Sequence, residues 1–131
     1  MEENQKTEQN QRPTLDRCFF GQKSALKAQY NKESRSIYIG VGKKSDDDKW
    51  SWNNAKIKDT EAAEIIRVLQ GQTDSVSFYH TFNGSSRQIW VNRKEEQLFV
   101  KIDNNSKGIN LGEQKVLKIV LLEAIRLQFF S

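Results

Sequence analysis

The chain has 131 residues, 36% of them apolar, with a formal net charge of +4 at pH 7 and a mean hydropathy of −0.78. This length suits one domain with a single packed core, and no apolar run approaches the roughly 18 residues of a membrane span. Cys18 is the only cysteine, which argues against a disulfide framework or a cysteine-based metal site. The positive charge permits a polyanionic partner without demonstrating one.

Residues 1–17 are rich in Gln, Glu and Asn, and they contain no apolar stretch behind a basic end. This composition is typical of a disordered tail and not of a secretory signal. We therefore expect a tail over 1–17 and one folded domain over 18–131. The single cysteine favours an intracellular location: the cytoplasm or nucleoid, or an organelle or the nucleus in a eukaryote.

Apolar and polar residues alternate in the first half of the folded region, which predicts three strands. They cover 23–31, 36–43 and 49–58, and "TLDRCFF" (14–20) can supply a fourth. Asp59 or Thr60 can then N-cap a helix with one apolar stripe, and Gly71 can end it.

The second half repeats this order. Strands are predicted over 75–82, 87–93, 97–103 and 108–111, and Gly112 opens a longer helix. Strands followed by a helix thus occur twice, which predicts an α+β fold made of a duplicated sheet-plus-helix unit.

The last helix is apolar over more than half of its circumference. One stripe must cover a sheet, and we expect the other to form a dimer or tetramer interface. The interface residues expected are Leu117, Val120, Leu121, Ala124 and Ile125. The alternative is a helix held between two sheets of one chain.

Hairpin geometry predicts which side chains of the second sheet face each other. A turn closed by 83 and 86 places Tyr79 opposite Trp90 and His80 opposite Ile89. A turn closed by 93 and 96 places Trp90 opposite Phe99. Alternation then leaves one sheet face apolar and puts these three aromatic residues in a row on the polar face.

Aromatic side chains on a polar sheet face can stack on nucleobases, which contributes roughly 1–3 kcal/mol per base. Lysine and arginine beside them would contact phosphates. The flanking cations are Arg87, Arg93, Lys94 and Lys101. Simple cross-strand aromatic pairing, or cover by a loop or partner subunit, is the alternative explanation.

For Trp50 and Trp52 in the first sheet, the question is whether the side chains lie on the outer face or in the core. A regular strand puts both indoles on the outer face with Lys56 and Lys58, whereas a bulge at Asn53–Asn54 would turn one or both inward. The outer face of the preceding hairpin would add one cation, one glutamine, two glycines and one more ring. These are Lys27, Gln29, Tyr38, Gly40 and Gly42.

Three segments resemble the plant Whirly family. "FGQKSAL" (20–26) is similar to the family motif "YKGKAAL", with Lys23 at a matching position, although Gly21–Gln22 differ from its Lys-Gly. "KWSWNNAKIKDTEAAEIIRVL" (49–69) resembles the strand-to-helix segment in which Trp52 matches a family tryptophan. "SVSFYHTF" (75–82) resembles "SCEFFHD".

This resemblance implies the Whirly-like arrangement, shared with positive-cofactor-type transcriptional coactivators, Pur-type proteins and archaeal ThermoDBP-like proteins. Members bind single-stranded nucleic acid through sheet surfaces and assemble through their helices. By the same resemblance, Lys23 lies in the motif that supports higher assembly in Whirly proteins.

The sequence offers little for catalysis. His80, the only histidine, is predicted on the core face, with no nucleophile or carboxylate placed by sequence to work with it. Asp46–Asp48 is predicted to be a solvated turn away from the binding path, because adjacent carboxylates on a loop do not converge on a cation. We therefore expect no enzyme activity and no cofactor.

These observations predict a non-catalytic, largely sequence-independent binder of single-stranded DNA, working as a dimer or higher oligomer. A protein-interaction or transcription-coactivator module and a single-stranded RNA binder are the alternatives. The residues expected to contact nucleic acid are Lys23, Lys27, Tyr38, Trp50, Trp52, Lys56, Lys58, Tyr79, Arg87, Trp90, Arg93, Phe99 and Lys101.

Overall fold

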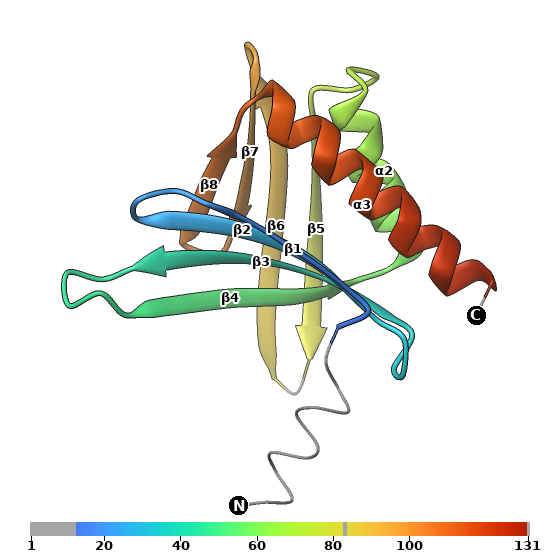
Figure 1. Cartoon of the computed structure of the whole chain (residues 1–131), viewed down its shortest axis with the longest axis horizontal. Coiled ribbons are helices and arrows are strands. Elements are labelled where there is room, and N and C mark those ends of the chain that lie inside the picture. Colours follow the sequence, from blue (N-terminus) through green and yellow to red (C-terminus); the bar gives the residue numbers. More distant parts are fainter. Residues whose placement is uncertain (1–12, 83, 131) are drawn as a thin grey trace, which may run out of the picture.

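The computed structural model describes residues 13–82 and 84–130, apart from the side chain of Phe82. This part forms two four-stranded antiparallel sheets, each followed in the chain by a helix (Figure 1). The first unit comprises β1 (Leu15–Phe20), β2 (Ser24–Asn31), β3 (Ser36–Lys44), β4 (Trp50–Ile57) and α2 (Asp59–Leu69). The second comprises β5 (Ser75–Phe82), β6 (Ser85–Lys94), β7 (Gln97–Ile102), β8 (Asn105–Ile109) and α3 (Leu111–Phe130). The predicted duplicated α+β plan is confirmed.

The N-terminal boundary of the folded region lies earlier than predicted. β1 begins at Leu15, which pairs with Tyr30 of β2. Residues 15–17, expected in the tail, therefore belong to the first sheet, whereas residues 1–12 of that tail lie outside the described residues. The last strand is also displaced, because β8 ends at Ile109 and Leu111 already starts α3.

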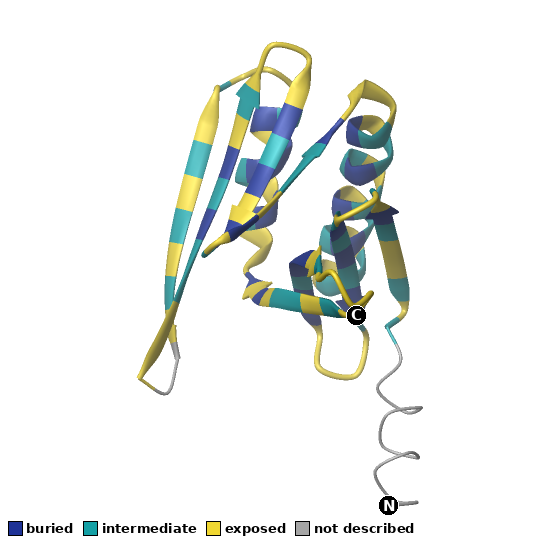
Figure 2. Cartoon of the chain, turned by 90° about the vertical axis from the view of Figure 1, so that its left-hand side faces the viewer, coloured by how far each residue is buried: buried dark blue, intermediate teal, exposed yellow. Residues whose placement is uncertain are grey.

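The strands of the two sheets run across each other in Figure 1, and one hydrophobic core lies between the sheets and the helices. Two amides join the sheets: Asn53 Nδ2 donates to Ile102 O at 2.9 Å, and Asn105 Nδ2 donates to Val41 O at 3.2 Å. Such bonds satisfy polar groups that the packing would otherwise bury without partners. Each sheet thus has an inner face on the core and an outer face that carries the alternate side chains. Figure 2 shows this as bands of buried and exposed residues along the strands.

The hairpins of the second sheet each close one residue away from the predicted position, which shifts the cross-strand register by two residues. Phe82 pairs with Ser85, and Lys94 pairs with Gln97. Gly84 and Glu95 have φ of 78° and 58°, the left-handed backbone that two-residue hairpin loops require. A shift of two residues keeps each side chain on its predicted face but gives it a different cross-strand neighbour.

α2 ends in a Schellman motif, as its terminal glycine predicts. Gly71 has φ of 76° and its N–H donates to Val68 O at 3.0 Å, while Gln72 N–H donates to Arg67 O at 2.9 Å. At the other end the cap is Lys58, one residue before the predicted Asp59 or Thr60, and its N–H donates to Glu61 Oε1 at 2.8 Å.

α3 begins with a capping box in which Asn110 and Glu113 exchange hydrogen bonds at 2.9 and 3.0 Å. The helix contacts β1, β2, β3, β7 and α2. It therefore lies against both sheets of its own chain, which was the alternative to a subunit interface. Among the residues described, neither helix combines the length and apolar character that a membrane crossing requires.

Three of the five predicted interface residues of α3 are corrected by this packing. Leu117 and Leu121 are fully buried and Ala124 is 1% exposed, all within the core of one chain. Val120 and Ile125 are partly buried against the same core. The apolar residues that α3 does expose are Leu111, Ile119, Leu122, Phe129 and Phe130.

Candidate nucleic-acid interface

The outer face of the first sheet carries the tryptophans. β3 pairs with β4 without interruption from Ile37↔Ile57 to Lys44↔Trp50, so there is no bulge at Asn53–Asn54. Regular alternation therefore places Trp50 and Trp52 on the outer face, opposite Ala55 and Ile57 of the core. Of the two arrangements that the sequence allowed, the structure has the outward one.

Three aromatic rings meet on this face and are called the aromatic cluster: Phe20, Trp50 and Trp52. The two indoles are stacked, with centroids 5.9 Å apart and planes inclined by 24°. Phe20 meets Trp50 edge to face at 5.6 Å. The tryptophans are half-buried and Phe20 is 63% exposed. The cluster thus presents a broad apolar surface to solvent from β1 and β4, the two edge strands of the sheet.

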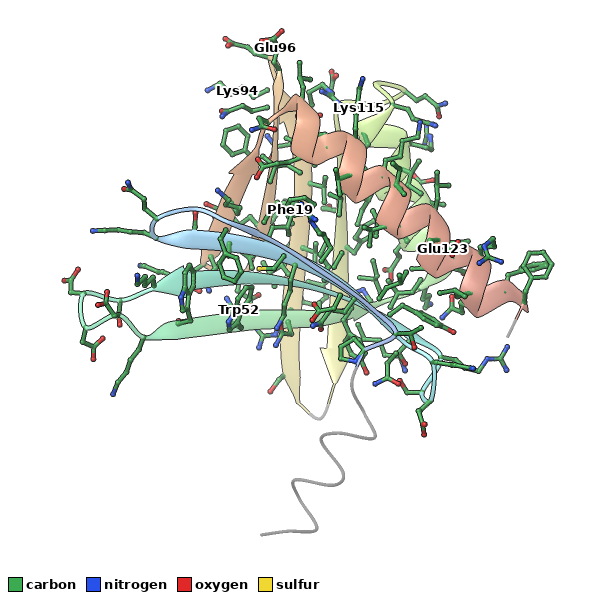
Figure 3. The ribbon with its side chains drawn as sticks, in the orientation of Figure 1. Phe19, Trp52, Lys94, Glu96, Lys115 and Glu123 are labelled. Carbon is green, nitrogen blue, oxygen red and sulfur yellow. The ribbon has the colours of Figure 1, made fainter. Side chains whose placement is uncertain are left out.

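Small residues between these edge strands let the rings lie down on the sheet. Phe20, Ala25, Gly42 and Trp52 are cross-strand neighbours in one row. A Cβ on Gly42 would lie 2.8–2.9 Å from three atoms of the Trp52 indole, which means that the face of the ring covers the glycine. Trp52, labelled in Figure 3, therefore has one face on the backbone of β3.

One lysine contacts the aromatic cluster, and a second lies beside Tyr38 on the same face. Lys27 Nζ lies 4.3 Å from the centroid of the Trp52 ring, a cation–π contact that holds both side chains. Its stem crosses Gly40, since a Cβ there would lie 2.8 Å from Lys27 Cε. Lys56 is exposed and faces Tyr38 across β3 and β4. The predicted association of rings and cations is therefore present on this face.

The second sheet carries its aromatic residues on its outer face, but not in the predicted row. Tyr79 faces Gln88 instead of Trp90, and Trp90 faces Ser77 and Lys101 instead of Phe99. The two-residue shift of both hairpins spreads the three rings along a diagonal. Tyr79 is 66% exposed, while Trp90 and Phe99 are half-buried. Within the described residues, no ring of this diagonal contacts another.

Each half-buried ring of the second sheet has a partner of another kind. Lys101 Nζ lies 5.2 Å from the centroid of Trp90. Phe99 lies over Gly108, where a Cβ would come within 2.8 Å of its ring. Both sheets thus combine an aromatic ring over a glycine with a lysine over an indole, although only the first sheet brings its rings together.

Two of the expected phosphate contacts are corrected. Arg87 and Arg93 lie on the inner face, because they alternate in step with Ile89 and Val91 of the core. Arg87 Nη1 binds Asp103 Oδ2 at 2.9 Å. Arg93 Nη2 donates to Val68 O and Leu69 O at 2.9 and 3.0 Å, and so caps the C-terminal end of α2. Both cations have structural partners on the side away from the aromatic residues.

The remaining lysines lie at the ends of the sheets. Lys23 is exposed in the β1–β2 turn, where its carbonyl accepts from Lys44 N at 2.9 Å. Lys58 is exposed where β4 leads into α2. Lys94 lies at the turn between β6 and β7, at the top of Figure 3. Lys23, Lys58 and Lys94 thus lie away from the centre of the outer face that carries Lys27 and Trp52.

His80 and the acidic turn have local partners. His80 is half-buried on the inner face, faces Arg87 instead of Ile89, and its Nε2 lies 2.9 Å from Glu61 Oε2. The carboxylates of Asp47 and Asp48 lie 4.0 and 3.4 Å from the ammonium groups of Lys49 and Lys44. Residues 13–82 and 84–130 contain no group of three or more His, Cys, Asp or Glu side chains that could hold a metal ion. The acidic turn, however, adjoins Trp50 and does not lie remote from the aromatic cluster.

Phe20 was not predicted as part of this face. It follows Phe19, which is 3% exposed in the core, and two adjacent phenylalanines obscure the period of two. Once β1 is aligned with β2, Phe20 falls opposite Ala25 and Phe19 opposite Leu26. The sequence leaves a strand over 14–20 open, and without its register on β2 the two phenylalanines cannot be assigned to the core and the outer face.

Comparison with known proteins identifies the fold. No model of a known protein family matches the sequence, and no curated protein matches it. Among solved structures, the chain is similar to the plant transcriptional regulator PBF-2, with a TM-score of 0.63 and 13% sequence identity over 88% of this chain and 90% of that one. At this identity the likeness shows the fold alone. The chain has the Whirly-type arrangement of two four-stranded antiparallel sheets, each followed by a helix.

Proposed function

We propose that this protein binds single-stranded DNA, without catalysis and with little dependence on base sequence, chiefly through the outer face of its first sheet. The observation that carries the proposal is the aromatic cluster, in which Phe20, Trp50 and Trp52 meet over Ala25 and Gly42. Side chains that only fill the core lie on the inner face of the sheet, whereas these three rings lie on its outer face.

Stacking explains why a single strand suits this surface. Every base of a single strand has an accessible π-face, and base–aromatic stacking contributes roughly 1–3 kcal/mol per base without reading its identity. A duplex has already stacked its bases on one another, so we expect it to bind weakly. Lys27, which contacts Trp52, and Lys56, which faces Tyr38, would bind the phosphates beside these rings.

The diagonal of the second sheet extends the proposal. Tyr79, Trp90 and Phe99 with Lys101 offer separate stacking positions rather than one continuous surface. We assign them a secondary contribution. Phosphate contacts from lysines of both sheets would make the log affinity fall by about 0.7 per neutralised phosphate as log salt rises.

A titration tests the proposal. A fluorescent thirty-nucleotide oligo-dT is mixed with the protein at low and at moderate salt, and the anisotropy is followed for the wild type, Trp52→Ala and the control Ser51→Ala. Ser51 is exposed on the opposite face of the same strand. We expect Trp52→Ala to weaken binding at least tenfold and Ser51→Ala to leave it unchanged.

Two results would count against the proposal in different ways. Absence of binding at low salt would remove the nucleic-acid function and favour a protein-interaction module. Binding that Trp52→Ala leaves intact would keep the function but remove the aromatic cluster as its site. Bases of DNA and RNA offer the same π-face, so stacking alone does not distinguish the two. Repeating the titration with oligo-U of equal length decides between DNA and RNA.

A transcription coactivator is the second candidate, because the similar structure PBF-2 is a transcriptional regulator. Single-strand binding would then be one part of the work, acting on melted DNA. A pull-down of transcription components that survives nuclease treatment, and that Trp52→Ala does not weaken, would favour this second function.

We also propose self-association, with a surface that differs from the predicted one. Ile119, Leu122, Phe129 and Phe130 are 47–74% exposed and follow one side of α3. Exposed apolar stripes of this kind mark protein interfaces. Light scattering coupled to size exclusion should give a mass above 15.2 kDa for the wild type and the monomer mass for Ile119→Asp. A monomeric wild type would contradict this part of the proposal.

A further inference from the structure

A polar pocket of about 280 Å³ opens on the outer face of the first sheet. We call it the amide pocket, and its lining residues are Pro13, Gln29, Asn31, Tyr38 and Asn54. It adjoins the aromatic cluster. Tyr38 faces Gln29 and Lys56, Asn54 belongs to the next row with Gly40 and Lys27, and Trp52 belongs to the row after that.

Three of the lining side chains have hydrogen-bonding capacity to spare. Within the described residues, neither the Tyr38 hydroxyl nor the Asn54 carboxamide has a hydrogen-bond partner. Gln29 Nε2 donates to Asp16 Oδ1 at 3.0 Å, which orients the amide and leaves its carbonyl oxygen without a partner in the described part of the chain. Asn31 is committed to the β2–β3 turn, where its Oδ1 accepts from Glu33 N and Ser34 N.

Gly40 brings the Asn54 amide down onto the sheet. A Cβ at position 40 would collide with Asn54 Oδ1 and would lie 2.8 Å from Lys27 Cε. Because glycine has no side chain, Asn54 and Lys27 can both lie across the backbone of β3. An amide, a phenol ring and an ammonium group therefore lie on neighbouring rows of one face.

We infer that the amide pocket receives one base of the bound strand and reads it, with adenine as the base that it favours. The inference rests on the proposed function and adds a single point of base recognition to it. The volume lies just below the roughly 300–1,000 Å³ of small-molecule pockets, which suits one base. Tyr38 offers the ring on which that base stacks.

The polar groups account for the choice of adenine. A carboxamide presents one donor and one acceptor side by side, and Asn or Gln pairs with adenine in this way through two hydrogen bonds. Asn54 can make that pair, while the free Gln29 carbonyl oxygen can accept from the exocyclic amine. Lys56 and Lys27 flank the pocket on β4 and β2 and can bind the phosphates on either side of the base.

The test uses three twelve-nucleotide strands: oligo-dT, and oligo-dT with one adenine or one cytosine at its centre. Each is titrated into the wild type, Asn54→Leu and the control Asn92→Leu. Leucine keeps the size of the amide and removes its hydrogen bonds, and both asparagines are exposed on strands. We expect the wild type and Asn92→Leu to bind the adenine strand at least about fivefold more tightly than oligo-dT. In Asn54→Leu the three strands should bind equally.

The outcomes separate this inference from the proposed function. Equal wild-type affinity for the three strands, a preference for another base, or a preference that Asn54→Leu leaves unchanged would overturn the pocket as an adenine reader. Binding of all three strands would still support the proposed function in each of these cases. Failure of every strand to bind at low salt would remove both.

Discussion

The two sheets of this protein carry nearly the same kinds of side chain on their outer faces but arrange them differently. In the first sheet the rings of the aromatic cluster come from the two edge strands, and Ala25 and Gly42 between them leave room for the rings to meet. In the second sheet each of three successive strands supplies one ring, separated along a diagonal by polar residues. The number of aromatic residues is similar, but only one sheet has a continuous aromatic surface.

The positions of the small residues decide this difference. An aromatic side chain on a sheet normally stands up between its neighbours, since each neighbouring strand also projects a Cβ. Where the neighbour is glycine, the ring can lie flat, as Trp52 does over Gly42 and Phe99 over Gly108. Only the first sheet has two small residues side by side in one row. The space above them lets rings from both edge strands converge.

The largest expected effect compares the two faces directly. We predict that replacing both Trp50 and Trp52 by alanine weakens oligo-dT binding about a hundredfold, because two stacking contacts of roughly 1–3 kcal/mol each are lost. Replacing Tyr79 and Phe99 by alanine should weaken binding about tenfold or less. Anisotropy titrations at one salt concentration measure both. A larger loss from the second pair would reverse the assignment of the principal face.

A second comparison tests whether a flat ring matters, rather than only its presence. In Gly42→Val the new side chain collides with the Trp52 indole, whereas in Gly108→Val it collides with Phe99. We predict about a tenfold loss of oligo-dT affinity for Gly42→Val and little change for Gly108→Val. A shift in tryptophan fluorescence without loss of affinity in Gly42→Val would show that the flat position of the Trp52 ring over residue 42 is not required for binding.

A third comparison separates cations that face solvent from cations that hold the fold. Lys56→Gln should reduce the slope of log affinity against log salt by about 0.7, the value for one phosphate on a single strand. Arg93→Met should leave that slope unchanged but lower the free energy of unfolding by about 1–2 kcal/mol, because two carbonyls at the end of α2 lose their donor. Salt titrations and thermal melts of both variants measure these effects. A changed slope in Arg93→Met would contradict its structural role.

The fold follows from patterns that the sequence shows clearly. The period of two in β3, the apolar stripe of α2 and the terminal Gly71 each depend on residues close together in the chain, and all three predictions are confirmed. The duplicated order of strands and helix then leaves few ways to bury both apolar sheet faces.

The details of the site depended on less local information. The β5–β6 hairpin closes one residue earlier than predicted, around the Asn-Gly pair that two-residue loops favour. The sequence therefore contains the signal for the observed register, and the prediction put the turn at the wrong position. Alternation also places Arg87 on the inner face with Ile89, although the partner Asp103 lies sixteen positions away. The sequence left two environments open for Leu117, a subunit interface or a position between two sheets of one chain, because the crossing of the sheets is a tertiary property.

The smallest expected effect offers a direct map of the bound strand. Cys18 is half-buried in the row of Lys27, Gly40 and Asn54, between the amide pocket and the aromatic cluster. Partial burial, with a smaller contribution from the Asp16 carboxylate, raises the pKa of the Cys18 thiol above its ordinary value. A raised pKa leaves less thiolate at a given pH, and the thiolate is the reactive form.

We therefore predict that Cys18 of the free protein reacts with a chromogenic disulfide reagent at pH 8 more slowly than the same cysteine in urea. The rate should still rise as the pH is raised toward the pKa. Saturating oligo-dT should slow the reaction a further severalfold, because a strand that runs from the cluster to the pocket passes over the thiol. Trp52→Ala should remove this protection at the same oligonucleotide concentration. Full binding without protection would place the strand on the second sheet, where Trp90 and Lys101 would then carry the contacts assigned to Trp52 and Lys27.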